Sequence, residues 1–351
     1  MVDSRAPVVY DDPVGSVRNI LEKINVSSPV RLDEPMSLHT SFRVGGPADI
    51  YAEPRSAEDL SEIVREARRL DIPLFTLGGG ANILVSDAGI RGLVIDMRNF
   101  EELAVAADGG TPMGRGNPAE GTNDGDGDER AAGGNPALVR AGAGLPISDV
   151  AAWCADRGLE GLDFLYAMPG SVGGSLWMNA RCYGESIVDV LREAEYVDEE
   201  GSRGVYQVDP KDFDYKKSPF QSRKWVILSA LFALRPGDPE EIWNRMRSHQ
   251  QDRTGKGHFI APSAGSVFKN NRAFGSPTGK IIDELGLRGH QIGGARISDQ
   301  HANIIVNAGG ATAGDIRRLV EFVQSEVRTR TGFELEREVL YAGEWPDEDD
   351  R

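Results

Sequence analysis

The sequence predicts an α+β protein made of two unlike parts, and three observations predict it. Segments with helical spacing and short apolar, strand-like runs follow one another along the chain. Three glycine-rich stretches all fall in the first half, and the composition shifts near Pro236, where a new helical segment begins. A length of 351 residues suffices for two or three domains. We therefore expect one unit over residues 17–235 and a second over residues 236–342.

Composition and charge disfavour several classes of protein. A hydrophobic content of 40% and a charged content of 27% are typical of a globular chain. The net charge of −16 argues against a surface for nucleic acid or anionic membrane. The N-terminal residues lack the pattern of a signal peptide, and no apolar run approaches 18 residues, so we expect no membrane insertion. Cys154 and Cys182 lack metal-binding spacing, which predicts free thiols in a reducing cytoplasm and no metal site.

The first unit begins with a well-marked helix between short strands. Ser56 is placed to cap the helix, with Asp59 three residues later. Strands are expected over residues 72–77 and 92–97. The apolar positions that define the inner face of the helix are Leu60, Ile63, Val64, Ala67 and Leu70.

Three polar segments are expected to be loose. Residues 1–16 form a proline-punctuated tail, and residues 343–351 form an acidic one. Residues 108–136 are rich in glycine and aspartate and contain no aromatic residue, which predicts a disordered surface insertion. Its Asp-Gly alternation resembles a calcium loop but lacks the closing glutamate, so the disordered interpretation is favoured.

After the insertion, "ALVRAGAG" predicts a strand, and a helix follows from Pro146 to a stop at Gly158. The next stretch, "AMPGSVGGSLWMNA" over residues 167–180, is apolar but carries three glycines, which would weaken a strand and break a helix. We therefore expect a loop with exposed backbone there, followed by strand-like pieces through "KWVILSALFALRPG".

The second unit opens with the helical segment "DPEEIWNRMRSHQQ". A short helix, "GKIIDELGL", and a strand, "HANIIVN", come next. A long helix should begin at the N-cap Thr312 and end at Gly332. The stretch "FELEREVLYAG" is expected to form the closing strand.

The three glycine-rich stretches suggest a ligand that lies close to the main chain. "LGGGANILVSD" directly follows a predicted strand, where backbone N–H groups can surround a phosphate, although a plain tight turn is an alternative. It is neither a G-x-G-x-x-G fingerprint nor a P-loop. With "HTSFRVGGPADIYAEP" and residues 167–180, it suggests a long, flat, multiply charged ligand such as a dinucleotide cofactor.

The second unit offers polar side chains with two interpretations each. Ser266, beside a glycine, is either a proton donor at a sharp turn or a hydroxyl that satisfies that turn. Glu336 and Glu338 would share one face of a regular strand, but carboxylates near a chain end are usually only solvated. His301 precedes a buried strand and, taken alone, is more often structural.

Seven segments, taken in order, resemble the UDP-N-acetylenolpyruvoylglucosamine reductase family. The likeness runs from about Val30 to about Tyr341 and is interrupted chiefly by the insertion. The short passage between "SVFKN" and "GKIIDELGLRG" resembles the second type of this family. The segments are "HTSFRVGGPAD", "LGGGANILVSD", "GLDFLYAMPGSVGGSLWMNA", "FDYKKSPF", "PSAGSVFKN", "GLRGHQIGGARISDQHANIIVN" and "LEREV".

The resemblance implies a fold and an activity. The fold would be the FAD-binding fold of the vanillyl-alcohol oxidase and p-cresol methylhydroxylase type, with two α+β subdomains at about 17–91 and 92–235. An α+β substrate-binding domain would follow, and its closing strand would return to the active site. The activity would be reduction of UDP-N-acetylglucosamine enolpyruvate to UDP-N-acetylmuramate for peptidoglycan. NADPH would reduce bound FAD, and flavin N5 would deliver hydride to the enolpyruvyl methylene.

The resemblance also implies residue roles. Ser266 would protonate the substrate carbon, and Glu338 would stabilise the enol-like intermediate while protonated or sharing a proton. The chemistry, rather than the resemblance, suggests Lys269 as a candidate to hold the resulting alkoxide. The substrate would contact Tyr215, Asn270 and His301. FAD would be held by Arg43, Gly45, Gly78, Gly79, Gly80, Ala81, Asn82, Pro169, Gly170, Ser171, Gly173 and Gly174.

Two positions depart from the family pattern. Lys216 stands where the family has an active-site arginine, and it keeps the charge but loses the planar fork that grips a carboxylate. Lys217 or Arg223 could substitute, and the sequence does not choose between them. Arg181 replaces a more usual glycine. The alternatives that we carry are another FAD-dependent oxidase on the same fold and a non-catalytic nucleotide-binding regulator.

Overall fold

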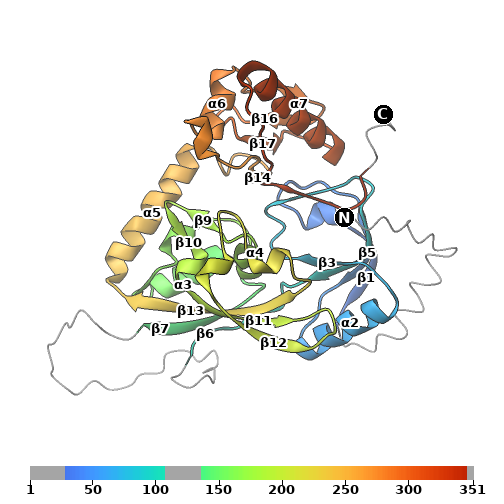
Figure 1. The fold of residues 1–351 in the computed structure, drawn as a ribbon, viewed down its shortest axis with the longest axis vertical. Helices are drawn as coiled ribbons and strands as arrows, with labels where there is room; N and C mark the ends of the chain where they lie inside the picture. The colour runs from blue at the N-terminus through green and yellow to red at the C-terminus, as the bar shows by residue number, and fades with distance from the viewer. Residues whose placement is uncertain (1–27, 107–135, 346–351) are drawn as a thin grey trace.

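The structure is a computed structural model that describes residues 28–106 and 136–345. The expected tail over 1–16, nearly all of the expected insertion over 108–136 and most of the expected acidic tail over 343–351 lie outside the described residues. Figure 1 shows two sheets side by side in the lower part of the molecule and a smaller α+β unit above them, which we call the upper unit.

The first sheet has the strand order β1-β2-β5-β3, in which β1 and β2 are antiparallel while β5 pairs in parallel with both β2 and β3. The helix α2 connects β2 to β3, and its predicted cap is confirmed because the Ser56 side chain accepts from the Asp59 backbone N–H. The sheet extends through Asp96, beyond the subdomain boundary expected near residue 91. The elements are β1 (Val30–Pro35), β2 (Pro47–Ala52), α2 (Ala57–Arg69), β3 (Leu74–Leu77), β4 (Ile83–Val85) and β5 (Ile90–Asp96).

The second sheet is antiparallel and has the order β12-β11-β13-β7-β6. Its side chains and those of the first sheet fill one hydrophobic core, to which α5 contributes Ile242 and Met246. The helix that follows the composition shift at Pro236 therefore packs onto the lower part of the molecule, against α3 and the turn Asp163–Leu165. The elements are β6 (Leu103–Val105), β7 (Ala137–Gly142), α3 (Ile147–Ala155), β8 (Leu159–Glu160), α4 (Val172–Trp177), β9 (Arg181–Cys182), β10 (Glu185–Ser186), β11 (Leu191–Val197), β12 (Arg203–Gln207), β13 (Val226–Pro236) and α5 (Pro239–Gly255).

The glycine-rich stretch at residues 167–180 contains a helix, so the expectation that its glycines would break one is wrong. α4 runs through Gly173 and Gly174, and the side chain of Ser171 accepts from the Gly174 N–H as its cap. A Cβ on Gly173 would lie 3.0 Å from Ala143 Cβ, and the Gly173 N–H already donates to the Ala143 carbonyl at 2.9 Å. Close packing of backbone on backbone selects glycine here and outweighs helix propensity.

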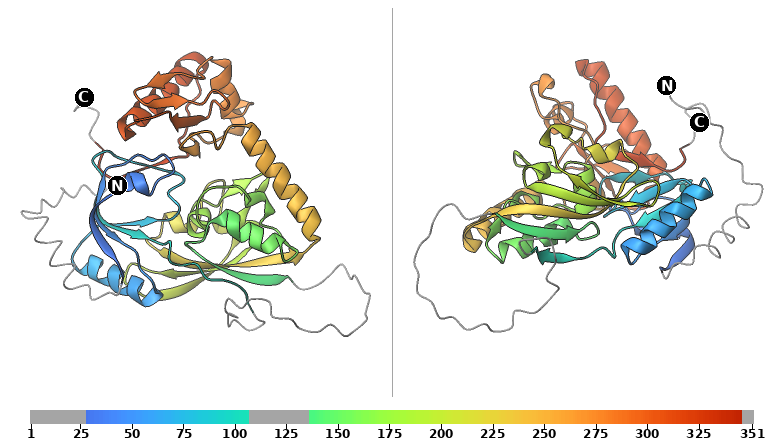
Figure 2. Two further views of the ribbon diagram at one scale, coloured as in Figure 1. Left: turned by 180° about the vertical axis from the view of Figure 1, so that it is seen from behind. Right: turned by 60° about the horizontal axis from the view of Figure 1, so that its bottom comes forward.

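The upper unit holds a four-stranded sheet, β14-β17-β16-β15, with α6 and α7. The predicted ends of the long helix are confirmed, because Thr312 and Asp315 form a capping box and Gly332 has a φ of 77°. The left view of Figure 2 shows α5 rising obliquely from the lower part to this unit. The elements are β14 (Ser263–Ser266), α6 (Thr278–Glu284), β15 (Gln291–Ile292), β16 (Ala295–Ile297), β17 (Ile304–Asn307) and α7 (Ala313–Thr331).

The closing strand is shorter than the sequence suggested. Only β18 (Leu340–Ala342) is a strand, and it pairs in parallel with β4 of the lower part. The residues before it make a single β-bridge, between Phe268 and Arg337. The chain therefore crosses from the upper unit back to the lower sheets as an extended connection. No helix within the described ranges is long and apolar enough to cross a bilayer.

Candidate active site

A large cavity lies where the upper unit faces the lower sheets, and its volume is about 1860 Å³. Its lining includes Gly78–Asn82 from the first sheet, α4 from the second and Ser266 from the upper unit. Ligand pockets usually have volumes of about 300 to 1,000 Å³. This cavity is therefore large enough for a dinucleotide and a second molecule together.

Glycine-rich segments meet at the floor of the cavity. A Cβ on Gly79 would lie 2.7 Å from the Cα of Gly170, and a Cβ on Gly78 would lie 2.5 Å from the Ser171 hydroxyl oxygen. Gly80 has a φ of +60°, and a Cβ there would be 2.0 Å from the His39 carbonyl oxygen. No side chain fits between these loops, which leaves bare main chain facing the cavity and satisfies the requirement of a phosphate cradle.

Most of the residues predicted to hold a cofactor line this cavity, and two do not. Those that line it are Gly78, Gly79, Gly80, Ala81, Asn82, Pro169, Gly170, Ser171, Gly173 and Gly174. Arg43 is exposed, and Gly45 packs against Val85 and Met36. The neighbours of Arg43, Phe42 and Val44, are buried in the core of the upper unit, so this stretch docks that unit. Its effect on the cavity is indirect.

Ser266 and Glu338 are brought together by pairing between backbones. The Glu338 N–H donates to the carbonyl of Val267, the residue after Ser266, at 2.8 Å. Both side chains line the cavity. The Ser266 hydroxyl makes no hydrogen bond within the described part of the chain, and Gly265, with a φ of +71°, turns the strand beside it. The alternative that this hydroxyl satisfies its own turn is therefore not what the structure shows.

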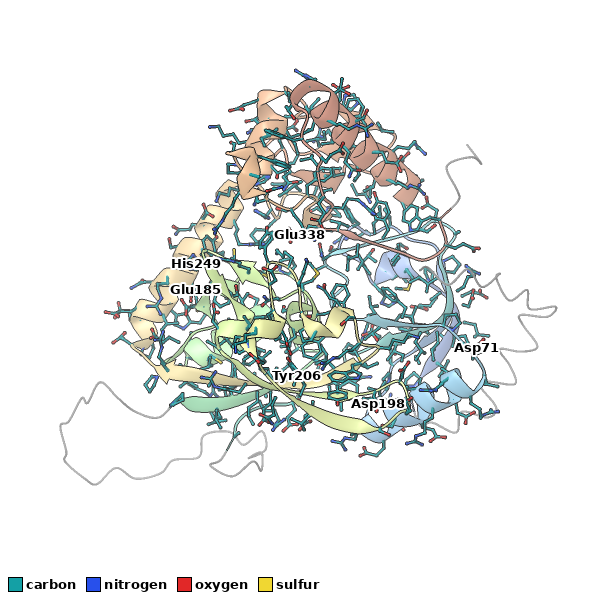
Figure 3. The ribbon with its side chains drawn as sticks, viewed as in Figure 1. Asp71, Glu185, Asp198, Tyr206, His249 and Glu338 are labelled. Atoms are coloured by element: carbon teal, nitrogen blue, oxygen red, sulfur yellow. The ribbon has the colours of Figure 1, made fainter. Side chains whose placement is uncertain are left out.

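Lys216 and Glu338 form an ion pair across the cavity wall. Lys216 Nζ lies 2.6 Å from Glu338 Oε1, and each side chain is 14% exposed. Lys216 sits in the turn Asp214–Lys217 with a φ of 57°, a left-handed conformation that is uncommon for lysine. Gln221 donates to the Lys216 carbonyl at 3.0 Å and helps to fix this backbone. Figure 3 places Glu338 between the upper unit and the lower sheets.

The two glutamates do not share a face, because residues 333–339 are not a regular strand. Glu336 is 72% exposed and pairs with Lys269 at 2.5 Å. Neither of these two residues lines the cavity. Lys269, the sequence candidate to hold an alkoxide on Ser266, is therefore engaged elsewhere, and that expectation is wrong.

The three residues expected to contact a substrate also line the cavity: Tyr215, Asn270 and His301. Asn270 Oδ1 accepts from the Thr278 N–H at 2.9 Å at the start of α6, which orients its amide group. Burial, followed by the charge of Lys256, lowers the pKa of His301 below its ordinary value, so its ring is neutral at pH 7. It can offer a hydrogen bond without a charge.

Sequence reasoning missed three kinds of residue around this site. Arg253, in the last turn of α5, and His258, three residues after that helix, line the cavity. Asn82 was expected only to hold a cofactor, yet its Nδ2 donates to the Glu338 carbonyl at 3.1 Å and its own carbonyl accepts from the Leu340 N–H. Asp87 accepts from two N–H groups at the start of α7. The partners of Asn82 and Asp87 are more than 200 residues away in the chain, so no local motif indicates these contacts. The one signal is that Asp87 is the last residue of the "LGGGANILVSD" segment.

Known protein families and their members resemble this chain in sequence. Residues 257–342 match the family model described as UDP-N-acetylenolpyruvoylglucosamine reductase, C-terminal domain, and residues 48–113 match an FAD binding domain. A UDP-N-acetylenolpyruvoylglucosamine reductase of Treponema denticola is 39% identical over 324 residues, which cover 89% of this chain and 93% of that protein. One of Treponema pallidum is 36% identical over 363 residues, which cover 92% of this chain and 96% of that protein.

A solved structure agrees with the sequence comparison. The crystal structure of UDP-N-acetylenolpyruvylglucosamine reductase from Thermus caldophilus superposes with a TM-score of 0.68 at 30% identity. The superposition covers 91% of this chain and 99% of that one. The similarity therefore includes both the lower sheets and the upper unit.

Proposed function

The chain belongs to the UDP-N-acetylenolpyruvoylglucosamine reductase family, and from this we infer that it reduces UDP-N-acetylglucosamine enolpyruvate to UDP-N-acetylmuramate, a step of peptidoglycan synthesis, with bound FAD and with NADPH as reductant. One observation carries this inference at the level of residues. A cradle of bare main chain and the side chains of Ser266, Glu338 and Lys216 all face one cavity.

The glycine-rich floor fits FAD. The backbone of Gly78–Asn82 offers N–H groups to a pyrophosphate, and the segment Pro169–Gly174 lies against it with no room for a side chain between the two. FAD held by these two segments would supply the redox chemistry, that is, hydride transfer from NADPH to the enolpyruvyl methylene carbon. We assign the residues before about 236 to holding FAD and the upper unit to covering the substrate.

Ser266 is the proton donor in this proposal. Its hydroxyl proton is not committed to another described residue, so it can point into the cavity. A serine hydroxyl is a weak acid and delivers its proton only to a strongly basic carbon, such as the one next to the newly reduced methylene. The proton goes to that carbon and leaves an alkoxide on Ser266, which solvent reprotonates.

Lys216 and Glu338 act as a pair in this proposal. The Lys216 ammonium supplies positive charge where the enolpyruvyl carboxylate gains negative charge, and fixed charge of this kind lowers the barrier. Glu338 Oε1 lies 2.6 Å from the ammonium and holds it in place. Tyr215, Asn270 and His301 complete the contacts to the substrate.

We place this reaction in the cytoplasm, since Cys154 and Cys182 are both free thiols. The substrate partner is the enolpyruvyl sugar nucleotide, and the net charge of −16 gives no support for nucleic acid or membrane surfaces as partners.

The test separates the two half-reactions by anaerobic stopped flow with Ser266→Ala. Reduction of the flavin by NADPH should proceed as in the wild type. Reoxidation by UDP-N-acetylglucosamine enolpyruvate should slow by about 10² to 10⁴, the usual contribution of a positioned proton donor. Ser263→Ala, on the same strand but outside the cavity lining, is the matched control. Equal loss in both half-reactions would refute the role of Ser266. Fast reoxidation by air without substrate would favour an oxidase instead.

A further inference from the structure

Arg181 is a cavity cation to which the proposed mechanism gives no task. It begins β9 directly after the segment that carries α4, and its side chain lines the cavity. Its Nη2 makes one long hydrogen bond, 3.4 Å, to the carbonyl of Gly184 in its own hairpin. It forms no ion pair with any carboxylate in the described ranges. Its charge is therefore available to a ligand.

The other cations of the cavity lining are engaged. Five form ion pairs, and they are Arg68 with Glu200, Arg91 with Asp49, Lys216 with Glu338, Lys224 with Glu199 and Lys256 with Asp252. Arg223 stacks over the Trp225 ring at 4.3 Å, and Arg253 lies over the Phe259 ring at 5.9 Å, although the buried Arg253 Nε has no hydrogen-bond partner among the described residues. Of the cationic residues lining the cavity, only Arg181 has neither a carboxylate nor an aromatic partner among the described residues.

The hairpin that carries Arg181 is held in place at its tip. The Tyr183 hydroxyl has two acceptors for its one proton, Asp252 Oδ2 at 3.0 Å and the His249 carbonyl at 3.1 Å, and its ring stacks on His249 with the ring centroids 3.8 Å apart. At the base, the Ile187 N–H donates to the Ala180 carbonyl at 2.9 Å. A guanidinium on a fixed backbone loses less entropy when it binds an anion.

The Arg181 segment is tied to the turn that carries Lys216. Asn179 Nδ2 donates to the Asp214 carbonyl at 2.9 Å, and the Ser218 hydroxyl donates to the Trp177 carbonyl at 2.7 Å. Both residues therefore belong to one wall of the cavity. Lys216 is a point charge already paired with Glu338, whereas a guanidinium presents two parallel N–H donors that match a carboxylate.

We propose that Arg181 binds the carboxylate of the enolpyruvyl substrate and thereby orients the reacting carbon toward the flavin and Ser266. This inference rests on the proposed function. The planar fork that position 216 lacks is supplied from position 181, while Lys216 contributes charge. Arg181 is thus a substrate-binding residue that neither the family description nor the motifs indicated.

The test compares Arg181→Gln and Arg181→Lys with the wild type in steady-state assays. We expect the Gln variant to raise KM for UDP-N-acetylglucosamine enolpyruvate by about 10- to 100-fold, the usual effect of losing a charge-assisted hydrogen bond. The Lys variant keeps the charge but not the planar fork, so its KM should lie between those of the wild type and the Gln variant. Arg192→Gln removes an exposed charge outside the cavity lining and controls for net charge.

Two further measurements identify the anion that Arg181 binds. UDP, a diphosphate without the carboxylate, should inhibit wild type and variants equally, and NADPH should reduce the flavin of both at the same rate. A parallel loss of UDP affinity would assign Arg181 to the diphosphate and overturn the proposal, as would slower reduction by NADPH or an unchanged KM. If the wild type itself fails to oxidise NADPH with this substrate, the proposed function fails instead.

Discussion

At the scale of single residues, the Lys216–Glu338 pair is the feature that most constrains the chemistry. The φ of 57° at Lys216 is a strained backbone conformation, and its side chain is mostly buried. Both features destabilise the folded chain, and a surface lysine avoids them. Strained, charged residues of this kind cluster at functional sites. The position of Lys216 in the cavity wall agrees with that rule.

Replacing Lys216 should therefore damage one half-reaction selectively. We expect Lys216→Gln to slow reoxidation by the substrate roughly 100-fold or more, because a fixed charge at the developing oxyanion is lost. Flavin reduction by NADPH should be unaffected in stopped-flow traces. Lys216→Arg keeps the positive charge, so its reoxidation rate should be close to that of the wild type and well above that of Lys216→Gln. Failure of the Arg variant to recover any rate would show that charge is not what Lys216 supplies.

His258 should make stability depend on pH. Burial, followed by the nearby charges of Arg253, His301 and Lys256, lowers the pKa of His258 to about 4, while Asp252 opposes the shift. The ordinary pKa is 6.5, so between pH 6.5 and pH 4 the unfolded chain binds a proton that the folded chain does not. The stabilising contribution is complete above pH 6.5 and is lost as the pH falls toward 4.

The measurement is the free energy of unfolding in urea at several pH values. The wild type should lose more stability than His258→Gln between pH 6.5 and pH 4, because glutamine does not titrate. Identical pH profiles would contradict the shifted pKa of His258.

At the scale of elements, α4 contains two glycines that lower its helix stability but allow close contacts with its surroundings. Glycine inside a helix costs about 1 kcal/mol relative to alanine. Gly173 is needed because Ala143 lies against it, but a Cβ on Gly174 would meet only the Ser171 hydroxyl, at 3.5 Å. Gly174 lines the cavity, so open space for a ligand accounts for it.

Gly174→Ala should have opposite effects on fold and cofactor. The apoprotein should become more stable by up to about 1 kcal/mol, from helix propensity, while the Kd for FAD should rise. Urea unfolding and flavin fluorescence titration measure these quantities. Gly255→Ala, at the end of α5 with open space and outside the cavity lining, should stabilise the chain without changing FAD affinity. Unchanged FAD affinity in Gly174→Ala would remove Gly174 from the cradle.

At the scale of the whole molecule, the cavity exists only because the upper unit is seated on the lower sheets. Phe42, Val44 and Leu84 of the lower part are buried in the upper core, and β18 pairs with β4. Asp87 adds a polar connection, since its two carboxylate oxygens accept from the Ala313 and Gly314 N–H groups at 2.8 Å each. A carboxylate at a helix N-terminus is also favoured by the helix dipole.

Asp87→Ala should loosen this seating. We expect a loss of about 1 to 2 kcal/mol in unfolding free energy, the value of a helix cap with its dipole interaction, and a higher KM for the sugar nucleotide. Asp87→Asn keeps one acceptor oxygen and should lose about half as much. If Asp87→Ala matches the wild type in both urea midpoint and KM, the contact does not hold the units together.

Some features of this protein can be predicted from the sequence because they depend only on residues close together in the chain. The caps at Ser56 and Thr312 and the stop at Gly332 depend on residues within one turn, so the helix ends followed from the sequence. The glycine-rich loops and Ser266 were found from short motifs for the same reason. Motif order also indicated the family before any geometry was available.

Tertiary structure decided the features that depend on residues far apart in the chain. Gly173 is required in α4 because Ala143 packs against it. Arg43 lies outside the cavity lining while its two neighbours are buried in the upper core, and Glu338 rather than Glu336 pairs with Lys216. A motif specifies which side chains are present and which turns they favour. Which of them meet depends on how distant backbones pack, and packing free energy is set by the whole fold rather than by any one segment.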